Sequence, residues 1–375
     1  MGTVRPRRPG GVGRLALSAL LLAALPSFAP AEEQSPLAPL LDRIRTGSVD
    51  QAAEATDELV GRVVATLTEA LDAISGRPPA EQERLSRMLA RTTAILRLRL
   101  FRAGLSPADR TLLDDWAARD RELLELLFDD DPDQRLAALY QIPLEPGTAA
   151  GVLATGRVAD WDDTVVESAL EIAARLQDEA VARGLTRYVT QAVAVVQSGR
   201  LSPAEQAYVI VLMERVQRCI AILSAAGARD SVATIMDAIR CFSRPPYRRL
   251  FSLPDAFAAL GRLGDEQAVP LLLEYLDDRE LRAVHNIDVE TAVYLTVGDA
   301  ALLALVQIYG LAPEALGFRV GLTPKAVPGF VDQRARETAR QTFRAWHTEN
   351  GEKPPDQRKP LVAPPRDGPG ESHRP

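Results

Sequence analysis

The regular punctuation of this chain is what most constrains its fold. Stretches of helical length, rich in Ala and Leu, are separated by short runs of Gly, Pro and Asp from Ser35 to about Asn350. Ala and Leu supply 57 and 51 of the 375 residues, and both lose little on entering a helix. Apolar residues recur within these stretches at helical spacing. The sequence therefore predicts an all-α protein of successive amphipathic helices.

Helix boundaries follow from breakers and capping residues. Ser106-Pro107 and Ser202-Pro203 each combine a Ser N-cap with Pro at the first helical position. The alternation over Leu96–Leu100 is assigned to helix because its surroundings are helical, and no strand is predicted. The predicted helices span 36–46, 49–75, 79–103, 107–128, 132–142, 162–176, 179–198, 203–226, 230–243, 254–263, 266–277, 288–309 and 331–348.

Residues 1–31 have the pattern of a secretory signal peptide. Four arginines precede an apolar run from Leu15 to Leu25, and Ala29-Pro30-Ala31 offers small residues for cleavage. The run is shorter than the roughly 20 apolar residues of a membrane span. The sequence predicts export to the periplasm or the medium, with no membrane span after cleavage.

Removal of this segment makes the chain more acidic. The formal net charge of −7 becomes −11 once Arg5, Arg7, Arg8 and Arg14 are lost. A nucleic acid is therefore not an expected partner.

Export also bears on Cys219 and Cys241, since an oxidising compartment permits disulfides. Helix breakers at 227–230 lie midway between the two cysteines, so they would face one another in an antiparallel hairpin. A disulfide is one interpretation. The other is a pair of small buried apolar side chains.

The chain also resembles itself at two places. Residues 131–139 align with 162–170 at an offset of 31, each starting with an acidic cap. Residues 175–181 align with 262–269, which is one residue longer. Offsets in this range are typical of stacked helical hairpins.

Residues 255–278 resemble a HEAT-type repeat of the short, phycobilisome-lyase-like kind, in which Gly264-Asp265 ends one helix and Ala268-Val269-Pro270 begins the next. The segment from Val297 to Trp346 is similar to the C-terminal part of exported bacterial HEAT-repeat proteins of unassigned function, although it lacks a second Trp near its end. The resemblance implies an α-α superhelix, a solenoid of antiparallel hairpins. After Asn350, Pro, Gly and charged residues replace Ala and Leu, which predicts a disordered tail over 350–375. The predicted chain thus comprises the signal peptide, a helical region over 32–130, HEAT-like repeats over 131–349 and this tail.

Enzymatic members of this repeat class do not fit the residues present. The iron sites of deoxyhypusine hydroxylase use repeated His-Glu pairs, and this chain has no His-Glu dipeptide. Bilin lyases act inside the cell, against the predicted export. No cofactor is predicted.

Acidic clusters and histidines are the remaining candidates for a binding or metal site. The run Asp129–Asp133 fails the calcium-loop pattern at Gln134 and Tyr140, so we expect a loop that caps the next helix. Trp161-Asp162-Asp163 is interpreted as a similar loop, with a sugar site as the alternative. His285, His347 and His373 are isolated, and no zinc site is predicted. Residues 77–110 are basic and 114–133 acidic, which predicts mutual neutralisation or, alternatively, a patch for an anionic polymer.

One segment has the composition of a protein interface. Residues 240–251 gather arginines and aromatics, which are enriched at binding hot spots, around Pro245-Pro246. The candidate partner-binding residues are Arg240, Phe242, Arg244, Tyr247, Arg248 and Phe251; the alternative is a loop whose aromatics are packed in the core. We expect an exported α-solenoid scaffold that binds protein, with a hydrolase or binding protein for an extracellular polymer, acting through an acidic groove, as the alternative.

Overall fold

The computed structural model describes Pro78, Leu98 and residues 101–102, 105–198, 203–286, 292–319 and 328–361. It divides into two compact units, unit 1 over Met1–Ala207 and unit 2 over Tyr208–Pro375. Its described part is predominantly helical with one small sheet, which confirms the all-α class. The predicted signal peptide, the helices predicted before residue 77 and most of the one over 79–103 lie outside the described residues, as does the end of the predicted tail.

Unit 1 is built around a short, wholly buried helix. Its helices are α5 (Pro107–Arg119), α6 (Arg121–Leu126), α7 (Pro132–Gln141), α8 (Ala149–Arg157), α9 (Asp163–Leu176) and α10 (Glu179–Gln197). All residues of α8 are buried, against α5, α9 and α10. A Cβ on Gly184 of α10 would lie 2.1 Å from the Thr155 hydroxyl of α8. The absence of that side chain lets the two helices approach closely.

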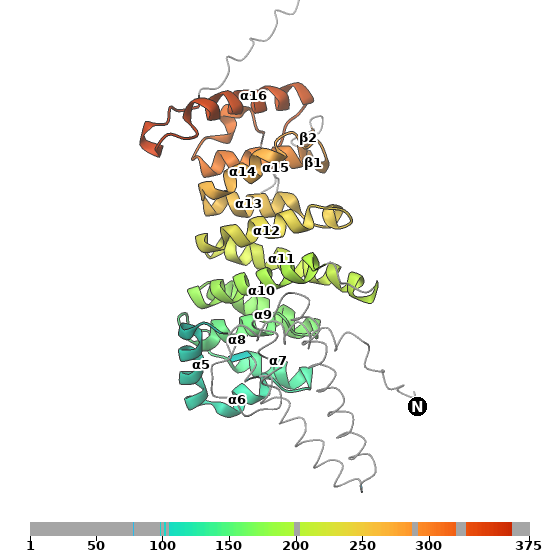
Figure 1. The fold of residues 1–375 in the computed structure, drawn as a ribbon, viewed down its shortest axis with the longest axis vertical. Coiled ribbons are helices and arrows are strands. Elements are labelled where there is room, and N and C mark those ends of the chain that lie inside the picture. The colour runs from blue at the N-terminus through green and yellow to red at the C-terminus, as the bar shows by residue number, and fades with distance from the viewer. Residues whose placement is uncertain are drawn as a thin grey trace, which may run out of the picture. The chain divides into compact units, whose positions relative to one another are not determined.

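Unit 2 is a succession of helices lying across one another in layers (Figure 1). Its elements include α11 (Pro203–Ala225, from Tyr208 onward in this unit), η3 (Arg229–Ser231), α12 (Val232–Phe242), η4 (Tyr247–Arg249), α13 (Leu253–Leu263), η5 (Glu266–Ala268), α14 (Val269–Tyr275), α15 (Val297–Ile308), η6 (Pro313–Leu316) and α16 (Gln333–Asn350). Within it, α13 and α15 pack closely against one another.

A β-hairpin interrupts unit 2 in a region with no predicted strand. Strand β1 (Leu281–Asn286) pairs antiparallel with β2 (Ala292–Thr296), with a bulge between Leu281 and Ala283. The helix predicted over 288–309 is therefore wrong in its first part. Thr296 and Asp299 form a capping box that starts α15 at Val297, immediately after the strand.

Other boundaries also differ from the prediction. The helix predicted over 107–128 is two helices, because Asp120 adopts a non-helical conformation and caps α6. The helix α8 was missed altogether. The two compact units divide between Ala207 and Tyr208, and the predicted division of the chain after residue 130 stays a prediction.

The start of the predicted tail is folded. The segment after α16 forms η7 (Pro355–Gln357), and the Trp346 indole donates a 2.8 Å hydrogen bond to the Lys359 carbonyl. The side chain of Asn350 accepts one from the Lys359 N–H at 3.1 Å, and Arg358 pairs with Glu266 at 2.8 Å. The prediction of disorder from residue 350 is therefore wrong as far as Leu361, the last described residue.

The second self-similar pair has the same local structure in both copies. Gln177 and Gly264 end α9 and α13 in the left-handed conformation, with φ of 48° and 65°. The next residue in each copy, Asp178 or Asp265, accepts a hydrogen bond from the first turn of the following helix. In the first pair, Asp131 and Asp162 cap α7 and α9 as the alignment predicts.

Candidate functional site

The three aromatic residues of the predicted partner segment serve mainly to pack it. Phe242 at the end of α12 and Phe251 after η4 are fully buried, and their rings stack with centroids 5.4 Å apart. Tyr247 is half-buried and lies edge-on to Phe242 at 6.1 Å. These contacts hold the turn over residues 244–250 against the core, as the alternative interpretation had it. The two phenylalanines are not accessible to a partner.

Arg240 and Arg248 are both engaged in ion pairs. Arg240 pairs with Asp237 at 3.2 Å on the exposed face of α12. Arg248 binds two carboxylates, donating from Nη2 to Asp278 and from Nε to Glu280, the latter at 2.8 Å. The hydrogen bond to Glu280 is the main cause of the raised pKa of Arg248. Arg248 therefore ties the turn to the segment before β1.

The remaining cations of the turn are exposed. Arg244 is one of the predicted residues, and Arg249 is a neighbour that the prediction left out. Beside them, the side chain of Leu250 is 53% exposed. The sequence gives no signal that Leu250 is exposed, because most leucines in the described ranges are buried.

The hairpin adds a second group of exposed apolar side chains. Val284 and Tyr294 are directly opposite one another across the two strands and are 50% and 41% exposed. Their neighbours Val293 and Leu295 point to the other face and are buried. Leu281 at the start of β1 is 53% exposed, and Val331 follows the bridge between Tyr294 and Phe330. We call Leu250, Leu281, Val284, Tyr294 and Val331 the hairpin surface.

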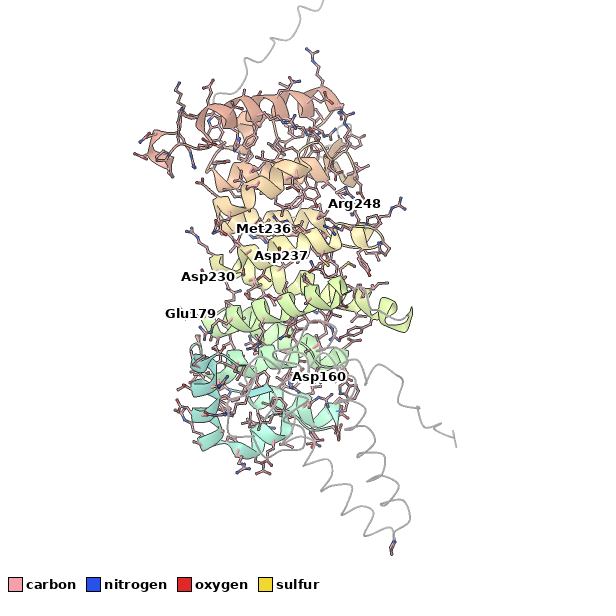
Figure 2. All side chains as sticks on the ribbon, viewed as in Figure 1. Asp160, Glu179, Asp230, Met236, Asp237 and Arg248 are labelled. Atoms are coloured by element: carbon pink, nitrogen blue, oxygen red, sulfur yellow. The ribbon has the colours of Figure 1, made fainter. Side chains whose placement is uncertain are left out.

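Arg282 of β1 also connects the turn to the hairpin. Arg282 of β1 donates hydrogen bonds to the carbonyls of Arg248 at 2.8 Å and Arg249 at 3.4 Å. It also pairs with Glu280 at 3.1 Å. Arg248 lies at the end of the helix layers where the hairpin emerges, and Asp230 lies at the other end (Figures 1 and 2). The turn and the hairpin are therefore neighbouring parts of one surface.

The acidic loops of unit 1 cap helices, as predicted. Asp131 accepts a 2.9 Å hydrogen bond from the Asp133 N–H, and Asp162 accepts from Thr164 and Val165. Beside Asp162, the buried Asp160 pairs with Arg135 at 2.8 Å and with Arg157 at 3.5 Å. Trp161 is 45% exposed and lies against the guanidinium of Arg135, with 4.7 Å between that group and the ring centroid. Asp160 and Asp162 are thus committed to structural contacts.

The cysteines are buried free thiols in the structure. Cys219 lies in α11 and Cys241 in α12, two helices joined by the turn that the sequence analysis placed between them. Burial raises the pKa of Cys219 to about 12 and also raises the pKa of Cys241. Both therefore remain protonated thiols near neutral pH, which corresponds to the second interpretation of the pair.

The described residues contain no group of three His, Cys, Asp or Glu side chains arranged to hold a metal ion. Of the predicted isolated histidines, His347 lies in α16, with its Nε2 3.0 Å from the Tyr309 hydroxyl. Among the described helices, none is both long and apolar enough to cross a bilayer.

Comparison with known proteins found no match: no family model, no curated protein and no solved structure is similar to this chain at a significant level. The resemblance to HEAT repeats therefore stays a prediction. The candidate site is defined by the geometry of the hairpin and the turn alone.

Proposed function

We propose that this chain is an exported α-solenoid scaffold that binds another protein through the hairpin surface. The observation that carries the proposal is the exposure of Leu250 in the turn and of Leu281, Val284 and Tyr294 on the hairpin, each at least 41% exposed. Arg282 joins the turn to the hairpin. Clustered apolar exposure rimmed by charge is characteristic of interaction sites.

The composition of the surface suits a binding hot spot. Tyr and Arg are enriched among residues that dominate binding energies, and Tyr294 stands at the centre of the hairpin. Burying apolar area against a partner contributes roughly 25 cal/mol for each Å² removed from water. A few such side chains supply useful affinity only when they are already ordered.

Ordering is provided by the residues behind the surface. Val293 and Leu295 anchor β2 in the core, and Phe242 and Phe251 anchor the turn. Arg248 and Arg282 hold the turn and β1 together through Glu280. The exposed side chains therefore sit on a framework that loses little further freedom when a partner binds.

The solenoid part of the proposal draws on the repeated turns. Gln177-Asp178 and Gly264-Asp265 build the same helix–turn–helix connection at two places in the chain. Repeats of this kind stack on their neighbours and present extended surfaces to partners.

Site-specific photo-crosslinking tests the binding function. The photoreactive amino acid p-benzoylphenylalanine is placed at Leu250 or Val284 in the full chain, and as a control at Leu144, a unit 1 residue that is 37% exposed. We expect one protein species to crosslink at the first two positions and not at the third. Equal crosslinking at all three positions, or none at Leu250 and Val284, contradicts the proposal.

Export is tested separately. N-terminal sequencing of the protein recovered from the envelope or the medium should begin at Glu32. An N-terminus that retains Met1 in a cytosolic fraction contradicts export without bearing on the binding surface.

A further inference from the structure

We infer that the partner presents an extended acidic segment, with carboxylates that bind Arg244 and Arg249 and apolar side chains that contact Leu250 and the hairpin. This inference rests on the proposed binding function and names the chemistry of the partner. The basis is that most arginines around the hairpin surface are paired with carboxylates of this chain, whereas two arginines of the turn are paired with none that the structure describes.

Most arginines in this region have an acidic partner within the chain. Arg240 pairs with Asp237, and Arg248 and Arg282 share Glu280. Other exposed arginines of unit 2 are also paired, since Arg279 binds Glu337 at 3.0 Å and Arg344 binds Asp277 at 2.6 Å. Among the residues that the structure describes, Asp237, Asp277, Glu280 and Glu337 are therefore occupied by arginines of this chain.

Arg244 and Arg249 are the exceptions within the turn. Both are exposed, and their side chains form no hydrogen bond or ion pair with any residue that the structure describes. Arg249 adjoins Leu250, which is 53% exposed, so a cation and an apolar side chain are presented together. This places uncompensated positive charge on a chain whose net charge is −7.

A carboxylate-bearing segment fits this arrangement better than a polyanion. Guanidinium groups bind carboxylates through paired, charge-assisted hydrogen bonds, and Leu250 and Tyr294 need apolar counterparts. A nucleic acid offers dense phosphate charge but no aliphatic side chains to contact Leu250. An acidic segment with interspersed apolar residues can bind both the two arginines and the exposed apolar side chains.

Fluorescence anisotropy with defined peptides tests the inference on the full chain. The probe is a labelled peptide of alternating Glu and Leu, and its counterpart carries Gln in place of Glu. We expect the Glu peptide to bind at least about tenfold more tightly, with an affinity that falls as salt is raised. Equal affinity for the two peptides, or tighter binding of a labelled oligothymidylate, overturns the inference.

Charge reversal locates the site. The double variant Arg244→Glu/Arg249→Glu should weaken Glu-peptide binding at least about tenfold. The control Arg229→Glu changes an exposed arginine of η3 and should leave binding within about twofold; η3 is at the end of the helix layers marked by Asp230 (Figure 2). An equal loss in both variants overturns the inference. Circular dichroism melting of each variant establishes that the fold is retained.

The two proposals fail in different ways. If crosslinking at Leu250 and Val284 captures one protein while the Glu peptide binds no better than the Gln peptide, the scaffold function stands and the acidic partner is rejected. If no protein crosslinks at either position, the scaffold function itself falls.

Discussion

Asp299 and Arg336 form a buried ion pair that joins the start of α15 to α16. The Nε of Arg336 lies 2.9 and 2.8 Å from the two carboxylate oxygens of Asp299, whose side chain is fully buried. Arg340 approaches the same carboxylate at 3.2 Å, and the Thr296 N–H donates to it at 2.9 Å. One carboxylate thus caps a helix, supports the base of the hairpin and fixes the last long helix.

Replacing Asp299 by Asn should destabilise the protein strongly. The change keeps the size of the side chain but leaves two buried guanidinium groups without their anion, which costs about 3–5 kcal/mol in comparable buried pairs. Chemical denaturation followed by circular dichroism measures the loss.

The control for Asp299 is Asp277→Asn, which breaks the exposed pair with Arg344. Exposed pairs contribute about 0–1 kcal/mol, so this variant should stay close to the parent protein. A loss of equal size in both variants would contradict the importance of burial at Asp299.

The matched turns at Gln177 and Gly264 predict opposite effects of substitution. Gly264→Ala should cost about 1–2 kcal/mol, because a Cβ there meets no atom within 4 Å and the cost is only that of the left-handed backbone. Gln177→Gly should leave the free energy of unfolding unchanged or raise it by up to about 1 kcal/mol, because Gly adopts the left-handed backbone without strain. The gain is reduced by loss of the hydrogen bond from the Gln177 amide to the Ala174 carbonyl. Thermal melting compares the two variants. A higher melting temperature for Gly264→Ala would contradict a left-handed backbone at Gly264.

His347 should make stability fall in mild acid. Burial lowers its pKa, with a further lowering by Arg358 and a raising by Glu352. The unfolded chain therefore takes up the proton more readily, so the stabilisation is complete above about pH 6.5 and is lost as the pH falls through the lower folded pKa. Denaturation midpoints measured across this range should vary less in His347→Gln than in the parent. An identical pH profile in the two proteins would contradict the prediction.

Cys219 and Cys241 should be unreactive in the folded protein. Their burial raises the pKa of both thiols, and the thiolate is the reactive form. A thiol reagent should modify neither cysteine under native conditions and both in denaturant, as mass spectrometry of the purified native protein would show. A native mass that gains nothing in denaturant until a reductant is added would instead establish the disulfide.

The sequence predicted helix boundaries correctly where they depend on residues close together in the chain. The caps at Ser106, Asp131 and Asp162 have the partners expected from their spacing. The hairpin was missed because Ala292–Thr296 runs without a break into α15, and a short apolar strand cannot be distinguished from buried helix by periodicity. The spacing of Thr296 and Asp299 in the capping box was the available signal that the helix begins only at Val297.

The candidate site was predicted only in part, because exposure and pairing there depend on residues distant in the sequence. Arg248 and Arg249 are adjacent and chemically identical, yet one is held by Asp278 and Glu280 and the other is exposed. That difference depends on residues about thirty positions away in the sequence, and no local pattern encodes it. Likewise, the exposure of Leu250 and the burial of Phe251 follow from how the turn packs on α12.

The folded segment after α16 bears on self-association. The buried face of α16 carries Ala339, Phe343 and Trp346, while its exposed positions are all polar apart from Ala345, among them Arg334, Thr338, Gln341 and Glu349. Residues 351–361 then cover the edge of this helix through Trp346 and Asn350. The exposed face of α16 therefore offers a further copy little apolar surface to stack upon, which disfavours end-to-end stacking of helical layers through this face.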